Sequence, residues 1–137
     1  MSSRPIRRAL LALLCAATLV RCGGGDDLTL PSEGLPTAIS VLAGDGQSGT
    51  VGQPLPDTLI ARVTDAKDRP VQGARVVFQA IAGGAGADLI PDTAVTDADG
   101  QARSVWLLGT LAGQQRVEAR VLVAPPATTV LKVAFTA

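Results

Sequence analysis

Four aspartates in two short, turn-rich segments are the clearest candidates for chemistry in this chain. Asp65 and Asp68 lie in one segment, and Asp97 and Asp99 lie in the other. Carboxylate oxygens suit Ca²⁺, but a calcium site needs about six to eight converging oxygens. The repeated D-x-D-x-D-G pattern of calcium loops is absent, and Asp also stabilises turns without a metal. Turn formation is therefore the preferred interpretation, and a cation site at these four residues is the weaker one.

The composition argues against catalysis and against a cofactor. The 137 residues include no His, which excludes a Ser-His-Asp arrangement and removes the commonest zinc ligand. Two Cys are too few for a four-thiolate metal site. Paired carboxylates remain formally possible, but the acids fall in turns, in a linker or at outward strand positions. We expect a protein that is not an enzyme and that binds no cofactor.

The net charge of zero hides an uneven distribution. Four of the 12 basic residues precede Cys22, which leaves 8 basic residues against 12 acidic ones from Cys22 onward. Nucleic-acid affinity comes mainly from Lys and Arg on phosphates, and base stacking needs aromatic side chains. Aromatic residues make up only 2% of the chain. We therefore expect no nucleic-acid partner.

The first 21 residues have the pattern of an export signal. Arg4, Arg7 and Arg8 precede an uncharged, mostly apolar run at 9–20. Such a run suits the apolar region of a signal peptide and is shorter than the roughly 20 residues of a transmembrane helix. The sequence thus predicts a helical signal peptide over 1–21.

The residues around Cys22 resemble the processing site of bacterial lipoproteins. Leu19 and Cys22 match that site, and the glycines and aspartates of GGGDD follow as a tether would. The resemblance implies acylation of Cys22, and one acylated Cys attaches a protein to a membrane without a spanning helix. In such lipoproteins an Asp directly after the Cys resembles a signal for retention in the inner membrane. This chain has Gly23 there, so the resemblance implies sorting to the outer membrane. Arg21 stands where the family has a small residue, so periplasmic or secreted protein remains the alternative. Residues 22–36 have the Gly, Asp and Pro content of a flexible tether.

From residue 37 the chain changes to short alternating segments separated by Gly, Pro and Asp clusters. Period-two alternation of apolar and polar residues is typical of strands with one buried face. Val117, Ala119 and Val121, for example, alternate with Arg116, Glu118 and Arg120. The pattern predicts seven strands, near 38–43, 57–65, 74–81, 88–96, 101–108, 115–123 and 129–136. Both aspartate segments are expected to be hairpin turns, the second with Gly100 in the left-handed position.

Seven short strands in about 100 residues indicate an all-β fold, a single immunoglobulin-like β-sandwich over 37–137. Trp106, the one Trp of the chain, is expected in the core, with an exposed contact residue as the alternative. The segment 37–43 carries no charge and no Pro, so it is expected at an open sheet edge that a further strand could join.

Several fragments, in one order, resemble the group 1 bacterial Ig-like domain (Big-1) of the invasin and intimin type. These are Val63-Thr64-Asp65, PVQGARVVF at 70–78, TDADGQA at 96–102, Leu108 to Gly113, and Val117-Glu118-Ala119. The family has a glycine where this chain has Arg69. The resemblance covers residues 37–137 and implies a non-enzymatic surface or periplasmic module.

Together these features predict an exported lipoprotein of the cell envelope, anchored through Cys22 and sorted to the outer membrane. It would display one Ig-like module for adhesion or for contact with a protein or envelope partner whose identity the sequence does not give. The alternatives are a structural spacer without a ligand, and a small carbohydrate- or cation-binding module.

Overall fold

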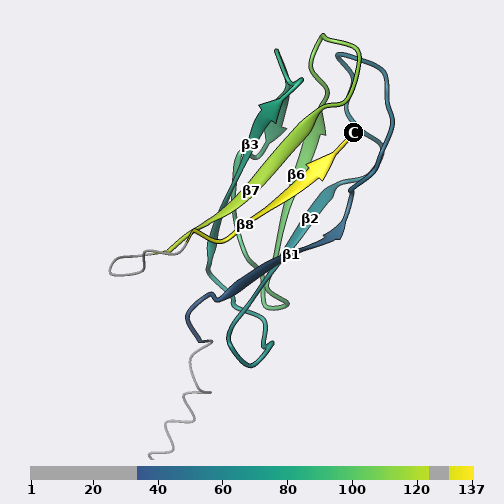
Figure 1. Cartoon of the computed structure of the whole chain (residues 1–137). Coiled ribbons are helices and arrows are strands. Elements are labelled where there is room, and N and C mark those ends of the chain that lie inside the picture. Colours follow the sequence, from purple (N-terminus) through teal and green to yellow (C-terminus); the bar gives the residue numbers. More distant parts are fainter. Residues whose placement is uncertain (1–33, 124–129) are drawn as a thin grey trace, which may run out of the picture.

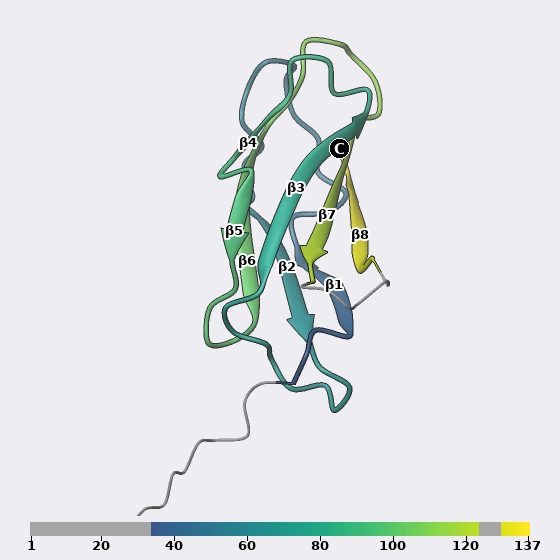
Figure 2. The same ribbon diagram turned by 90° about the vertical axis from the view of Figure 1, so that its left-hand side faces the viewer.

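Two antiparallel sheets of four strands face each other in the computed structural model, which describes residues 34–123 and 130–137 (Figures 1 and 2). The first sheet has the order β1 (Ala38–Ala43), β2 (Leu59–Thr64), β6 (Gln101–Leu107), β4 (Asp88–Ile90). The second has the order β5 (Thr93–Val95), β3 (Arg75–Ala82), β7 (Arg116–Leu122), β8 (Lys132–Thr136). The prediction of an all-β sandwich is confirmed.

The strand order is that of an immunoglobulin-like sandwich. Such folds place their first, second, fifth and fourth strands in one sheet and the remaining three in the other. Here β1, β2, β6 and β4 take the first set of places, and β3, β7 and β8 take the second. The short strand β5 is an addition at the edge of the second sheet.

The prediction of one strand over 88–96 is wrong. The segment forms two short strands, β4 and β5, which belong to opposite sheets. β4 pairs with β6, and β5 pairs with β3. Pro91 lies between them and has no N–H to continue a ladder. The crossing is held on both sides: the Pro91 carbonyl accepts a hydrogen bond from Ser104 Oγ (2.8 Å), and the Asp92 carbonyl accepts one from Phe78 N–H (2.7 Å).

The expectation of two hairpins is also corrected. The turn at 65–69 joins β2 in the first sheet to β3 in the second, and the turn at 97–100 joins β5 in the second sheet to β6 in the first. Only local pairing remains beside the first turn, between Thr64 and Pro70. Both turns are corners between sheets, so the chain changes layer soon after each.

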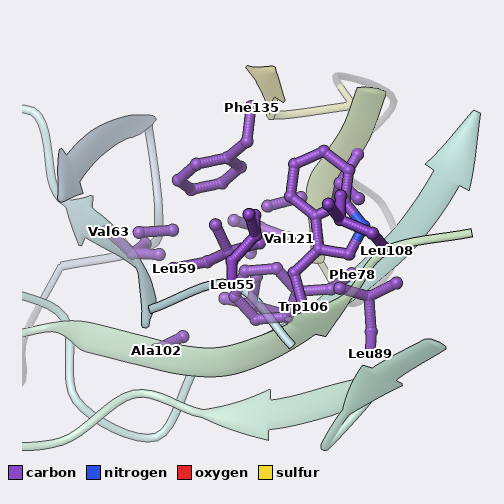
Figure 3. Packing of buried hydrophobic residues seen from close by; sticks show 14 of the residues in the cluster. Leu55, Leu59, Val63, Phe78, Leu89, Ala102, Trp106, Leu108, Val121 and Phe135 are labelled. Carbon is purple, nitrogen blue, oxygen red and sulfur yellow. The ribbon is translucent and has the colours of Figure 1, made fainter. Parts of the chain in front are cut away.

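The core lies between the sheets and is built from the predicted inward positions (Figure 3). Leu59, Ala61 and Val63 of β2 are fully buried, as are Val117 and Ala119 of β7. The complete set of buried apolar residues is Leu55, Leu59, Ala61, Val63, Val71, Val76, Phe78, Leu89, Ala102, Trp106, Leu108, Val117, Ala119, Val121 and Phe135.

Trp106 is the largest fully buried side chain, with an exposure of 0%. It projects from β6 in the first sheet towards the layer that holds Phe78 and Phe135, whose ring centres are 6.3 Å apart. The core position of Trp106 is confirmed, and its alternative role as an exposed contact residue is wrong. Its Nε1–H has no hydrogen-bond partner in the described part of the chain.

The predicted signal peptide (1–21), Cys22 and most of the tether lie outside the described residues. The last three tether residues, Gly34 to Pro36, are described and lie against the turn at 65–69, where Gly34 N–H donates to Asp65 Oδ2 (3.2 Å). Within 34–123 and 130–137, no helix is long and apolar enough to cross a membrane.

Candidate functional site: two braced poles of the sandwich

Asp65 is enclosed by the turn that it begins. Its Oδ1 accepts hydrogen bonds from the N–H groups of Lys67 (2.8 Å) and Arg69 (3.0 Å). Its Oδ2 accepts from the Arg69 guanidinium, with Nε at 2.8 Å and Nη2 at 2.6 Å. The Arg69 side chain, followed by the backbone donors, holds the pKa of Asp65 far below its usual range. The carboxylate is thus occupied by its own turn.

Asp97 repeats the backbone pattern of Asp65. Its Oδ1 accepts from the N–H groups of Asp99 and Gln101, both at 3.0 Å, which are two and four residues ahead as in the first turn. The residue three ahead has a positive φ in each turn: 70° at Gly100, as predicted, and 58° at Asp68. Asp68 therefore takes the position that Gly100 has in the second turn, and Arg69, the residue after it, donates its N–H and its guanidinium to the Asp65 carboxylate.

The structure keeps the four aspartates in two separate turns. Among the described residues there is no group of three or more His, Cys, Asp or Glu placed to hold a metal ion. The two turns lie at the same end of the sandwich, because Val63 N–H, one residue from the end of β2, donates to the Gly100 carbonyl (2.8 Å). Gly34 is bonded there too, so the described chain enters at this end, which we call the N-terminal pole (Figure 1).

The opposite pole is a set of three loops, 44–58, 83–87 and 108–115, which we call the loop crown (Figure 2). Gln115 holds the third loop from within, since it is 1% exposed. Its Oε1 accepts from Gly109 N–H (2.8 Å) and its Nε2 donates to the Leu111 carbonyl (2.9 Å). Thr110 N–H donates to the Ala85 carbonyl (2.9 Å), which joins the second loop to the third.

The first loop of the crown is held by two polar side chains. Gln47 Nε2 donates to the carbonyls of Gly44 (2.7 Å) and Asp57 (2.8 Å), and its Oε1 accepts from Asp57 N–H (2.8 Å). Asp45 Oδ1 accepts from the N–H (2.8 Å) and the hydroxyl (2.9 Å) of Thr136 on β8. The Thr136 backbone N–H, chiefly, keeps the pKa of Asp45 below its usual value.

A groove of about 340 Å³ opens in the crown between the first and third loops, over Leu108. Its walls include Ser48, Gly49 and Val51 on one side and the segment 112–115 on the other. Two apolar side chains of the crown are exposed, Val51 at 41% and Leu111 at 56%. Backbone amides and small apolar groups on a braced loop surface are suited to contact with a protein chain, not to proton transfer or nucleophilic attack.

β1 lies at the edge of the first sheet, as predicted. It pairs with β2 on one side, and β8 of the other sheet lies close to its free side. The loop that follows β1 is bonded to β8, with Gly46 N–H donating to the Thr136 carbonyl (3.0 Å). That bond covers the end of the β1 edge nearest the crown. The addition of a further strand along the remainder of β1 stays a prediction.

Sequence reasoning missed the crown because its bracing residues carry no distinctive signal. Gln47 shares its loop with Gln53 and Gln115 follows Gln114, so neither stands out in the sequence, and their partners are backbone groups of residues up to ten positions away. The one available clue was the low tolerance of buried amides: a Gln next to a strand rich in Val and Ala is costly unless both of its ends are bonded.

Comparison with known proteins assigns neither a family nor a function. No protein-family model matches the chain, and no curated protein matches it significantly. A crystal structure of a conjugative transposon lipoprotein from Bacteroides eggerthii DSM 20697 is similar, with 10% sequence identity and a TM-score of 0.47 over 74% of this chain and 95% of that one. A likeness this distant carries no argument about function, and the fold assignment rests on the strand order itself.

Proposed function

We propose that this protein is a non-enzymatic display module of the bacterial cell envelope. It is exported by residues 1–21, attached to a membrane through acylated Cys22, and carries one Ig-like sandwich of the Big-1 type. The loop crown is the surface that meets a protein or envelope partner, for adhesion or assembly.

The single observation that carries this proposal is the placement of the two poles. The described chain enters at Gly34 beside the two aspartate turns, and the three loops of the crown lie at the other end of the strands. An anchor at the first pole therefore directs the second away from the membrane. The 12 residues from Cys22 to Glu33 reach at most about 40 Å when extended. This reach frees the sandwich from the headgroups but keeps it near the surface.

Bracing of the crown supports a role in binding. Loops fixed before contact lose less conformational entropy when a partner binds, which favours affinity. Here the buried Gln115, together with Gln47 and Asp45, fixes two of the three loops.

The anchor is tested by the intact mass of the mature protein purified from membranes of the producing bacterium. We expect a chain that begins at Cys22 and carries acyl groups. Cys22→Ser should leave the protein unacylated and shift it to the soluble fraction. Cys15→Ser, a matched change inside the apolar run, should retain both the mass and the membrane fraction. A mature chain cleaved elsewhere, with no lipid, contradicts the anchor.

The crown is tested by crosslinking on intact cells followed by quantitative recovery of partners. Val51→Ser with Leu111→Ser should reduce recovery of a specific partner. Ile90→Ser with Val105→Ser changes two exposed apolar residues on the outer face of the first sheet, away from the crown, and should leave recovery unchanged. If no partner depends on the crown pair, the spacer alternative is favoured.

A further inference from the structure

The outer face of the second sheet gathers half of the basic residues in the described chain. Arg75 of β3, Arg116 and Arg120 of β7, and Lys132 of β8 all occupy outward positions. The register places them on one surface, because Arg120 pairs with Lys132 and Arg75 lies across from the end of β7. We call these four residues the cationic face.

One acid lies among them and is largely enclosed. Glu118 is 7% exposed; it forms an ion pair with Arg120 and a second with Lys132 (3.3 Å). These two partners, Arg120 first, hold the pKa of Glu118 below its usual value, so the carboxylate stays charged. Glu118 is the only acid on the four strands of this sheet, all of which the structure describes. The side chains of these four strands therefore give the face a net charge of +3, and Asp45, which is bonded to Thr136 of β8, lies at the edge of the face near the crown.

At the end nearest the N-terminal pole, this face combines charge with exposed apolar groups. Arg75 pairs across the strands with Val95 on one side and Leu122 on the other. Val95 is 60% exposed and Leu122 is 55% exposed. A basic side chain between two exposed apolar ones is the arrangement found where proteins touch the headgroup region of a bilayer.

The same end adjoins the point where the chain enters the domain. Leu35, which is 79% exposed, lines a shallow groove together with Arg75 and Leu122. An anchor 12 residues before Gly34 holds this end within reach of lipid headgroups and raises their effective concentration at the face. Charge, exposed apolar groups and chain entry thus coincide at one place.

We propose that the outer face of the second sheet binds the phosphate-bearing surface of an anionic bilayer. The role of the tether rests on the proposed function, but the affinity of the face does not. When the face is bound, the sandwich lies along the membrane; when it is released, the sandwich extends and presents the crown. An acidic polysaccharide is the other partner that a basic face could bind. Binding to a polysaccharide would not account for the exposed apolar side chains of Val95 and Leu122 beside Arg75.

The experiment uses a chain that starts at Gly23, which lacks the signal and Cys22 and retains every core residue. Flotation with vesicles of phosphatidylcholine alone is compared with vesicles containing about one third phosphatidylglycerol, at about 50 and 500 mM NaCl. We expect binding to the anionic vesicles only, and its loss at the higher salt. Arg75→Glu with Arg116→Glu, neither in an ion pair among the described residues, should weaken binding about tenfold or more.

The control is Lys67→Glu with Arg103→Glu, which changes the net charge equally but lies off the face. It should retain at least half of the binding, and circular dichroism checks the fold of both variants. Equal binding to neutral vesicles, or equal loss in the two variants, overturns the proposal. Binding to alginate without binding to anionic vesicles assigns the face to polysaccharide and overturns it as well. Because this chain carries no acyl group, the result is independent of whether Cys22 is the anchor.

Discussion

At the scale of single residues, Asp65 joins two parts of the chain, its own turn and the entering segment at Gly34, through one carboxylate. It is 4% exposed and contacts its own turn, the Arg69 side chain and Gly34. Asp65→Asn keeps the shape but replaces one of the two acceptor oxygens with an NH2 donor, which faces N–H groups and leaves them unsatisfied. We expect the melting temperature to fall by about 5–10 °C. Thermal melts monitored by circular dichroism measure this.

Asp68→Asn is the matched control for that change. Asp68 is exposed and its φ is 58°, a conformation that Asn tolerates well. It should leave the melting temperature within about 2 °C of the parent. An equal loss in both variants would show that the enclosure of Asp65 contributes nothing to stability.

Trp106 gives a second test at this scale. Trp106→Ala removes the largest buried side chain and should lower the free energy of unfolding by about 3–5 kcal/mol. Trp106→Phe leaves a smaller void and removes an unpaired N–H, so we expect a loss of about 1–2 kcal/mol. Val105→Ala, at the outward neighbour, should cost less than about 1 kcal/mol. Urea unfolding followed by far-UV circular dichroism ranks the three, and equal costs for the two Ala variants would contradict the core position.

At the scale of elements, the alternation of apolar residues was enough to place the strands but not to assign them to sheets. The inward set on β7, Val117, Ala119 and Val121, is the one that the pattern predicts, because burial of one face imposes the period of two. The division of 88–96 depends on where Pro91 meets β6 and β3, which are distant in sequence. The two corners have the same cause: a local turn pattern does not encode which sheet receives the next strand.

The corner at Gly100 yields a prediction with an internal control. Gly100 and Gly73 have similar positive φ values, 70° and 78°. A Cβ at Gly100 would lie 2.5 Å from the Val63 carbonyl oxygen, whereas a Cβ at Gly73 would meet nothing within 4 Å. Gly73→Ala should cost about 1 kcal/mol for its backbone alone, and Gly100→Ala about 3 kcal/mol or more. Chemical denaturation measures both, and equal costs would contradict the close packing of the two corners.

At the scale of the whole molecule, the carboxyl groups determine how stability responds to pH. Asp45, Asp65 and Glu118 all have a pKa below the ordinary value in the folded state. The unfolded chain therefore binds more protons in acid, and the stability that is present above about pH 4 is lost as the pH falls further. The sequence has no His, so nothing titrates on the side chains between about pH 5 and 7.

We accordingly expect equal melting temperatures at about pH 5 and 7 and a lower one at about pH 3. The Asp65→Asn variant should lose less between about pH 5 and 3 than the parent does, because one of the three contributing carboxyls is gone. A melting temperature that changes between pH 5 and 7 would contradict this prediction, because the response would then not come from the carboxyl groups.

The candidate site was less accessible to sequence reasoning than the fold. The outward positions of Arg75, Arg116 and Arg120 follow from the alternation. That they share one surface with Lys132 depends on the pairing of β3, β7 and β8, which the alternation does not give. The crown depends on amides that bond to backbone groups in other parts of the loops. Each of these features is a product of topology, which local patterns do not specify.

The direction in which β1 runs determines how the protein responds to mechanical load. β1 starts at the N-terminal pole, extends towards the crown and is paired antiparallel with β2 along its length. Tension between an anchored N-terminus and a partner held at the crown therefore acts along the strands and loads all hydrogen bonds between β1 and β2 at the same time. A pull perpendicular to the strands would instead break these bonds one after another. A domain loaded in this way resists unfolding with all of those bonds together.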